Sequence, residues 1–146
     1  MSATQAPSTT DKVVIIAEFA NCTPEALFDC WVKPDLITQW WPSVAEIEPA
    51  LGGTYHLSWP KMNWHLRGRY TVFEPGKQLG FTWKWDHYLP QTEVMVLFEP
   101  LSDDSTKLTV THGSYSDSQE DRDARMGHLE GWQYFVNKLL DASITK

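Results

Sequence analysis

The pattern of hydrophobic and polar positions changes along the chain, and each pattern predicts a different element. Residues 12–19, KVVIIAEF, are apolar and rich in β-branched side chains, which favours an opening strand. Between residues 44 and 113, short alternating segments are separated by turn residues, as in an antiparallel sheet. The expected strands of this region are 44–49, 53–59, 64–75, 78–87, 92–100 and 106–113. With the opening strand, they make a sheet of about seven strands.

Helical signals occur directly after the first strand and at the end of the chain. Thr23 suits an N-cap and Pro24 the first helical position, so a helix begins there. Pro34 interrupts it and begins a second short helix, which Pro42 ends. A long helix is expected at 118–142, with one apolar stripe that the sheet must cover. The stripe consists of Leu129, Trp132, Val136 and Leu139 or Leu140.

Two residue pairs stand out in these predicted helices. Gly127 and Gly131 each cost about 1 kcal/mol relative to alanine in a helix interior. Spaced by four, they share a helix face, which indicates either close packing, the simpler interpretation, or room left for another group. Trp40 and Trp41 end the second short helix. At such a corner, one ring can pack beneath the helix as an anchor while the other forms part of a cavity entrance.

Composition and charge exclude several classes of function. The formal charge is −7 and no lysine or arginine cluster is present, which argues against a nucleic-acid or anionic-membrane partner. No apolar run is long enough to insert into a bilayer, and residues 1–11 lack the apolar stretch of a secretory signal. We therefore expect a cytoplasmic protein with a flexible tail at 1–11 and a single domain at 12–146. Its two cysteines, Cys22 and Cys30, are expected as reduced thiols.

Motifs for metal, nucleotide or serine-hydrolase chemistry do not occur in the sequence. The five histidines have no usual ligand spacing, and the cysteines form no Cys-x-x-Cys pair. There is also no GxGxxG, Walker or GxSxG motif. The sequence thus predicts neither a metal site nor a cofactor.

Several longer motifs resemble one known family. They are TPEALFDCWVKPDLITQWW, GGTY, GRYTVFEPGKQLGFTWKW, TKLTVTH and RMGHLEGW. In this order they are similar to the activator of heat-shock-protein ATPase homologue family, within the START or birch-allergen-like superfamily, over about residues 12–142. The resemblance implies an α+β helix-grip fold, in which a curved antiparallel sheet surrounds a long C-terminal helix and two short helices follow the first strand. It also implies an apolar cavity between sheet and helix.

The aromatic residues predict which side chains face that cavity. Phe81, Trp83 and Trp85 alternate along one strand, so their rings share one face of the sheet. His112 has the parity of the apolar residues on its strand and is expected inward, near the cavity rim. The predicted ligand-binding residues are Trp40, Trp41, Tyr55, Trp59, Tyr70, Phe81, Trp83, Trp85, His112, Arg125, His128 and Trp132.

Three polar residues in this set have alternative interpretations. Arg125 lies on the apolar stripe, where its guanidinium would hold a ligand carboxylate or phosphate at the cavity mouth. Alternatively, it is solvated or pairs with an acid such as Asp121. His112 and His128 would act as polar anchors or a proton shuttle, or they are hydrogen-bonded structural residues.

Fold alone does not choose among the functions of this superfamily, which include ligand carriers, enzymes and chaperone partners. We expect a binding protein for a small apolar or amphipathic molecule. The alternatives are a cyclase-like enzyme that uses His112 and a chaperone-docking module. The chaperone partner has less support, because activation in the family rests on an additional N-terminal domain and only the eleven-residue tail precedes the expected fold. Met95 and Leu97 stand at outward positions, which predicts an interface such as that of a homodimer.

Overall fold

The computed structural model describes residues 3–5, 11–88, 90–101 and 104–146. It confirms the α+β helix-grip architecture, with an antiparallel sheet in the order β1-β2-β8-β7-β6-β5-β4-β3. The strands are β1 (Thr4–Gln5), β2 (Lys12–Phe19), β3 (Val44–Ile47), β4 (Thr54–Trp59), β5 (Trp64–Glu74), β6 (Gln78–Trp85), β7 (Thr92–Pro100) and β8 (Thr106–Gly113). The helices are α1 (Pro24–Val32), α2 (Pro34–Ile37) and α3 (Gln119–Asp141), with short 3-10 helices η1 (Pro60–Met62) and η2 (Ser143–Thr145).

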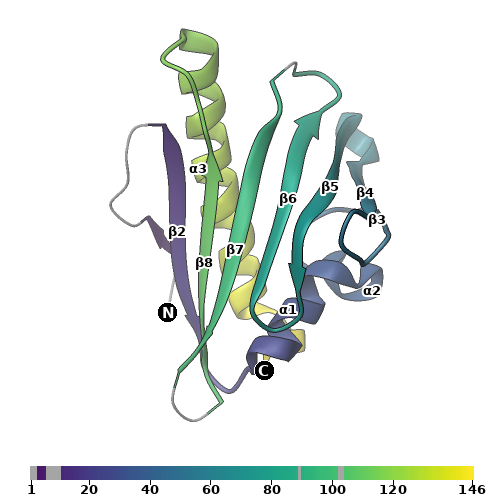
Figure 1. The fold of residues 1–146 in the computed structure, drawn as a ribbon, viewed down its shortest axis with the longest axis vertical. Coiled ribbons are helices and arrows are strands. Elements are labelled where there is room, and N and C mark those ends of the chain that lie inside the picture. Colours follow the sequence, from purple (N-terminus) through teal and green to yellow (C-terminus); the bar gives the residue numbers. More distant parts are fainter. Residues whose placement is uncertain (1–2, 6–10, 89, 102–103) are drawn as a thin grey trace.

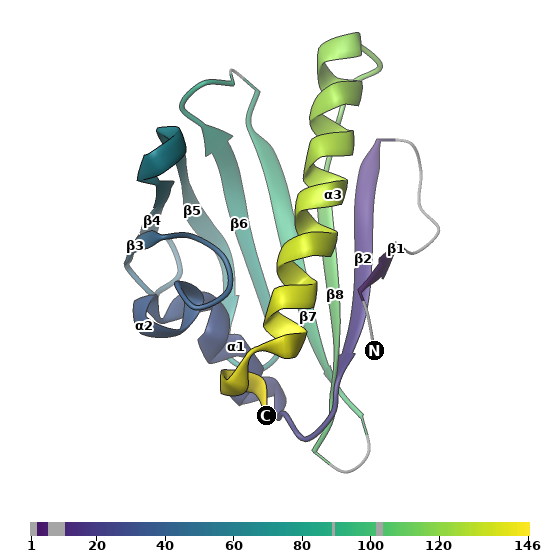
Figure 2. The same cartoon turned by 180° about the vertical axis from the view of Figure 1, so that it is seen from behind.

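Figures 1 and 2 show the sheet curving around α3, which crosses its inner face, while α1 and α2 lie near the C-terminal end of α3. The predicted apolar stripe of α3 is confirmed, because Leu129, Trp132, Val136 and Leu139 are its buried residues. No helix in the described part of the chain is long and apolar enough to span a membrane.

The described sheet has eight strands, one more than predicted. The additional strand, β1, lies within the predicted flexible tail, where Thr4 pairs with Ile16 of β2. Ala3 is buried beside it, and its N–H donates to Asn137 Oδ1 at 2.9 Å. Two residues are too few to show an alternating pattern, so periodicity missed this strand. Residues 1–2 and 6–10 of the predicted tail lie outside the described residues.

The junction between α1 and α2 explains the position of Trp40. The carbonyl of Cys30, near the end of α1, would normally accept a hydrogen bond from the N–H four residues later. That residue is Pro34, which has no N–H. The indole N–H of Trp40 donates to the Cys30 carbonyl instead, at 2.9 Å. The proline that begins α2 thus leaves the acceptor that Trp40 satisfies.

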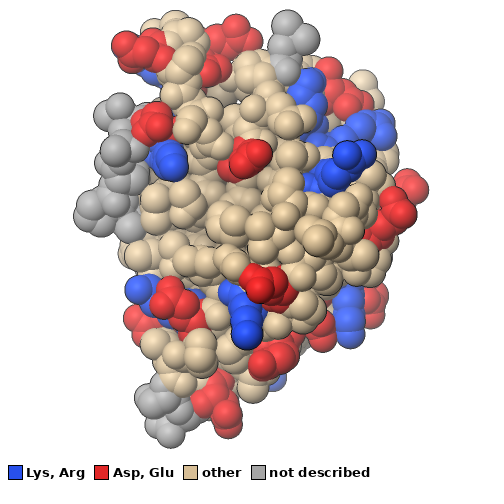
Figure 3. All heavy atoms as spheres, in the orientation of Figure 1, with Lys and Arg blue, Asp and Glu red and all other residues tan. Residues whose placement is uncertain are grey.

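The outer face of the sheet carries charged side chains mainly toward its periphery, with an uncharged region across the middle (Figure 3). Met95 and Leu97 of β7 are half-buried there, on the opposite face from the buried Val94 and Val96. A homodimer through this face stays a prediction, and light scattering that detects only monomer at high concentration would contradict it.

Candidate functional site

The candidate site is a groove between α3 and strands β4 to β6, with a volume of about 390 Å³. This volume lies within the usual range for small-molecule sites, roughly 300–1,000 Å³. The groove contains six of the eight tryptophans of the chain. Its lining residues are Trp41, Ser43, Trp59, Met62, Trp64, Trp83, Trp85, Gly127, His128, Gly131, Trp132, Tyr134, Phe135 and Lys138.

Gly127 and Gly131 line an open part of this groove. A Cβ atom on either glycine would meet no heavy atom of the described residues within 4 Å, apart from neighbours in the chain and the backbone of the helix. The packing interpretation of this pair is therefore wrong, because no described residue approaches the helix closely at these positions. Each glycine costs about 1 kcal/mol of helix stability, and the space that the two leave belongs to the groove.

The inner wall of the groove is a cluster of indole rings. Trp41 stacks on Trp83, with ring centroids 5.7 Å apart and an interplanar angle of 21°. It also lies 5.0 Å from the ring of Trp132. The indole N–H of Trp83 has no acceptor among the described residues, although the residue is only 4% exposed. The most exposed apolar lining residues are Met62 (52%), Trp64 (43%) and Tyr134 (61%).

The adjacent tryptophans have different surroundings, although their rings do not point in different directions. Trp40 is fully buried and makes the hydrogen bond to α1, whereas Trp41 lines the groove. Their rings nevertheless stack on each other, 5.6 Å apart at 26°. Trp40 is thus the inner support of Trp41.

His112 is enclosed rather than placed at a cavity rim. It is fully buried, and its Nδ1 accepts from the indole N–H of Trp132 at 3.0 Å. Because an indole N–H only donates, the neutral imidazole carries its proton on Nε2, which donates to Thr92 Oγ1 at 2.7 Å. Burial, and then the neighbouring His128, hold the pKa of His112 well below its usual value.

His128 does line the groove, and it is held in the same way. Its Nε2 accepts from the indole N–H of Trp85 at 3.0 Å, so its Nδ1–H donates to Tyr115 Oη at 2.7 Å. Burial lowers the pKa of His128 to about 4. The two imidazoles stack 4.6 Å apart at 16°, and Trp83 contacts both. With every ring nitrogen hydrogen-bonded, the pair has the environment of structural histidines.

The position predicted for Arg125 is wrong. Its guanidinium Nε donates to the backbone carbonyl of Lys12 at 2.9 Å, and the residue belongs to a separate surface hollow that also contains Arg122 and Asp117. The early turns of α3 lie beside β2 and the segment after β8, away from the groove. The charged residue that does line the groove is Lys138, near the other end of the helix.

The inner aromatic residues Tyr55, Tyr70 and Phe81 do not enclose a ligand-sized cavity between the sheet and α3. They surround a space of about 10 Å³, close to the volume that one water molecule needs. Their rings contact one another at centroid distances of 5.5–6.3 Å. The predicted deep cavity is therefore largely filled, and the groove of about 390 Å³ lies beside α3 instead.

Sequence reasoning missed Ser43 and most of the outer half of the groove. Tyr134, Phe135 and Lys138 follow Gly131 by three, four and seven residues, which is the spacing of a single helix face. Extending the face of the two glycines along α3 would have identified them. Met62 and Trp64 flank a turn, where no periodicity marks the direction of a side chain.

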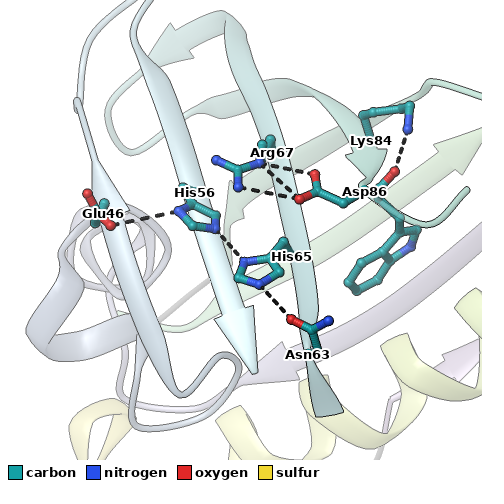
Figure 4. A network of polar contacts seen from close by, with 8 residues as sticks. Glu46, His56, Asn63, His65, Arg67, Lys84 and Asp86 are labelled. Atoms are coloured by element: carbon teal, nitrogen blue, oxygen red, sulfur yellow. Dashed lines mark hydrogen bonds and ion pairs between the residues drawn. The ribbon is translucent and has the colours of Figure 1, made fainter. Parts of the chain in front are cut away.

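A second polar cluster lies on the outer face of β3 to β5, opposite the groove (Figure 4). His56 Nε2 and His65 Nδ1 are 2.9 Å apart, and burial followed by Arg67 lowers the pKa of His56. Arg67 also pairs with Asp86 at 3.0 Å. Among the described residues, no group of three or more His, Cys, Asp or Glu side chains could hold a metal ion.

The two cysteines are buried as free thiols. Burial raises the pKa of Cys30 to about 12 and also raises that of Cys22. Both are therefore protonated near neutral pH, whereas a nucleophilic cysteine needs a lowered pKa. Cys22 and Cys30 thus form no disulfide with a described residue, as the sequence led us to expect.

Comparison with known proteins supports the fold. A protein from Mesorhizobium loti has a TM-score of 0.75 and 25% identity, covering 88% of this chain and 94% of that one. An HSP90 activator from Plasmodium falciparum has a TM-score of 0.72 and 21% identity, covering 88% and 92%. CalU16 from Micromonospora echinospora has a TM-score of 0.69 and 17% identity, covering 99% and 87%.

No curated protein sequence matches the chain. The profile of one family, described as "Activator of Hsp90 ATPase homolog 1-like protein", matches residues 21–143, which is most of the sequence. The chain therefore belongs to the Activator of Hsp90 ATPase homolog 1-like family.

Proposed function

We propose that this protein binds a small apolar or amphipathic molecule in the groove between α3 and the sheet. The observation that carries the proposal is the open space at Gly127 and Gly131, facing a wall of tryptophans. Flat aromatic faces bind apolar ligands over a large area, and ligand sites combine such faces with a few polar groups. Here the polar lining residues are Ser43, Lys138 and His128, and both ring nitrogens of His128 are hydrogen-bonded within the protein.

Two substitutions of Gly131 separate ligand binding from folding. Gly131→Phe places a ring in the groove and is expected to weaken binding of N-phenyl-naphthylamine, a neutral fluorescent probe, by about tenfold or more, or about 1.4 kcal/mol. Gly131→Ala is the matched control, because a methyl group meets no neighbour there. It should retain binding and raise the free energy of unfolding by roughly 1 kcal/mol. Energy transfer from the tryptophans to the probe measures the affinity.

The expected result is saturable binding of one probe per chain by the natural protein and by Gly131→Ala. If the natural protein binds no probe, or if Gly131→Phe binds it as well as the control does, the proposal is wrong. Urea unfolding of the three proteins checks that each variant is folded.

The cyclase-like alternative depended on His112 as an acid or base. Both ring nitrogens of His112 are hydrogen-bonded within the core, and no atom of this residue lines the groove. The geometry therefore favours binding over a reaction that uses His112. Mass spectrometry that detects a converted ligand, with conversion lost in His112→Gln, would reverse this preference.

A second candidate function is docking of a chaperone, favoured by the exposed apolar residues Met62, Trp64 and Tyr134 at the rim. The solved structure of an HSP90 activator shares this fold. Size-exclusion chromatography with purified Hsp90 tests it. A stoichiometric complex that Tyr134→Ser disrupts and Gly131→Phe retains would favour docking over ligand binding.

A further inference from the structure

We infer that the ligand of this groove is an elongated aromatic molecule with one anionic end, and that Lys138 binds that end. This inference rests on the proposed function and adds the chemical class and orientation of the ligand. It follows from the length of the groove along α3, from its aromatic wall and from the position of its one charged side chain.

The groove is longer than a single ring. Its lining residues on α3 extend from Gly127 to Lys138, which are eleven residues apart. At 1.5 Å per residue, this is about 16 Å of helix. Trp132 and Phe135 lie between these ends on the helix, and indole rings of β4 to β6 face them. An extended body of two aromatic rings matches this length better than a compact one.

Charge distinguishes one end of the groove from the other. At the Gly127 end, His128 is neutral, because its Nε2 accepts from Trp85. At the opposite end, the Lys138 ammonium lies 5.9 Å from the ring centroids of both Tyr134 and Phe135. Lys138 is the one ionised side chain among the described lining residues.

Lys138 is also available to a ligand. It makes no ion pair with a described carboxylate, although the chain carries nineteen acidic residues against twelve basic ones. A carboxylate beside it gains a charge-assisted hydrogen bond, while the apolar body remains on the tryptophans. Aromatic rings also attract cations, but a ligand cation at this end would be repelled by the ammonium.

Three para-substituted biphenyls test the inference, because they share one body and differ in charge. Biphenylacetate is anionic, biphenylethanol is neutral and biphenylethylamine is cationic. Isothermal titration calorimetry of the natural protein should show the acid binding about three- to tenfold more tightly than the alcohol, as expected for a partly exposed charge pair. The amine should bind most weakly, and added salt should reduce the advantage of the acid.

Two substitutions on α3 locate the anion. Lys138→Gln should bind the acid and the alcohol equally, with the affinity for the alcohol unchanged. Arg125→Gln is the matched control, since it removes the same charge from the same helix but outside the groove. It should preserve the advantage of the acid.

The outcomes separate the two proposals. If the alcohol binds as well as the acid, or if Arg125→Gln removes the preference and Lys138→Gln does not, this inference is wrong while the proposed function stands. If no biphenyl binds and N-phenyl-naphthylamine does not bind either, both are wrong.

Discussion

Replacing Trp40 with alanine is expected to lower the free energy of unfolding by about 3–5 kcal/mol, the usual cost of removing a buried tryptophan. The side chain is fully buried, and its ring contacts those of Trp31 at 4.8 Å and Trp41 at 5.6 Å. Its removal also leaves the carbonyl of Cys30 without a donor, because the residue that would bond it in a longer helix is Pro34. Urea unfolding followed by far-ultraviolet circular dichroism measures the loss.

Trp40→Phe separates the contribution of the buried ring from that of the hydrogen bond to the Cys30 carbonyl. Phenylalanine retains much of the buried ring but not the indole N–H. Trp40→Phe should therefore lower the free energy of unfolding by a smaller amount, about 1–3 kcal/mol for the unsatisfied carbonyl. Trp41→Ala is the companion variant, because Trp41 lines the groove and Trp40 does not. It should weaken binding of N-phenyl-naphthylamine, whereas Trp40→Ala that remains folded should weaken it less, because Trp40 only supports Trp41 from behind. A loss below about 1 kcal/mol in Trp40→Ala would contradict the anchoring role.

The free energy of unfolding is expected to fall as the pH decreases from about 6.5 to about 4. A histidine in the unfolded chain titrates near 6.5, whereas burial lowers the pKa of His128 to about 4 in the folded protein. Between these values the unfolded state binds more protons than the folded state, so acid favours unfolding. Protonation of His128 alone accounts for up to about 3 kcal/mol of this decrease in the free energy of unfolding. His112, whose pKa is lowered by burial and by His128, acts in the same direction.

The structure gives a reason for the low pKa values beyond burial. A proton added to His128 would occupy Nε2, which accepts from the N–H of Trp85, and in His112 it would occupy the acceptor of the Trp132 N–H. Protonation of either histidine therefore breaks a hydrogen bond, and it leaves the new N–H of the imidazole facing the N–H of the tryptophan.

Urea unfolding at a series of pH values measures this decline. His128→Gln keeps an acceptor and a donor but does not titrate, so its decline should be clearly smaller. His56→Gln, on the outer face, is the surface control and should retain most of it. If the free energy of unfolding falls equally with pH in His128→Gln and in the natural protein, the stacked histidine pair is not the cause of the decline.

The candidate site was only partly predictable. The alternation of Trp83 and Trp85 on one strand correctly indicated a shared aromatic face, and both residues line the groove. Phe81 has the same parity but lies in the filled interior. Parity states which face of a sheet a side chain occupies, whereas the space in front of it depends on elements far away in the sequence.

Arg125 shows that the face of a helix likewise does not tell which element packs against it. Its spacing from Leu129 placed it on the apolar stripe, yet the strand that lies under this turn of the helix is β2, whose Lys12 carbonyl accepts from it. Conversely, the sequence did not predict Lys138 as a groove residue, because a lysine on a helix is ordinarily solvated. Its place at the groove results from the direction in which α3 crosses the sheet (Figure 2).

By itself, the sequence determined the order and type of seven strands and three helices, the apolar stripe of α3 and the helix starts at Thr23 and Ser118. These features depend on periodicity, turn residues and caps, which act over a few neighbouring residues. The tertiary structure alone decided that the space lies beside Gly127 and Gly131, that His112 and His128 stack, and that Lys138 is the cation at the groove. Open volume and hydrogen-bond partners arise between distant segments, and no local pattern in the chain encodes how closely those segments pack.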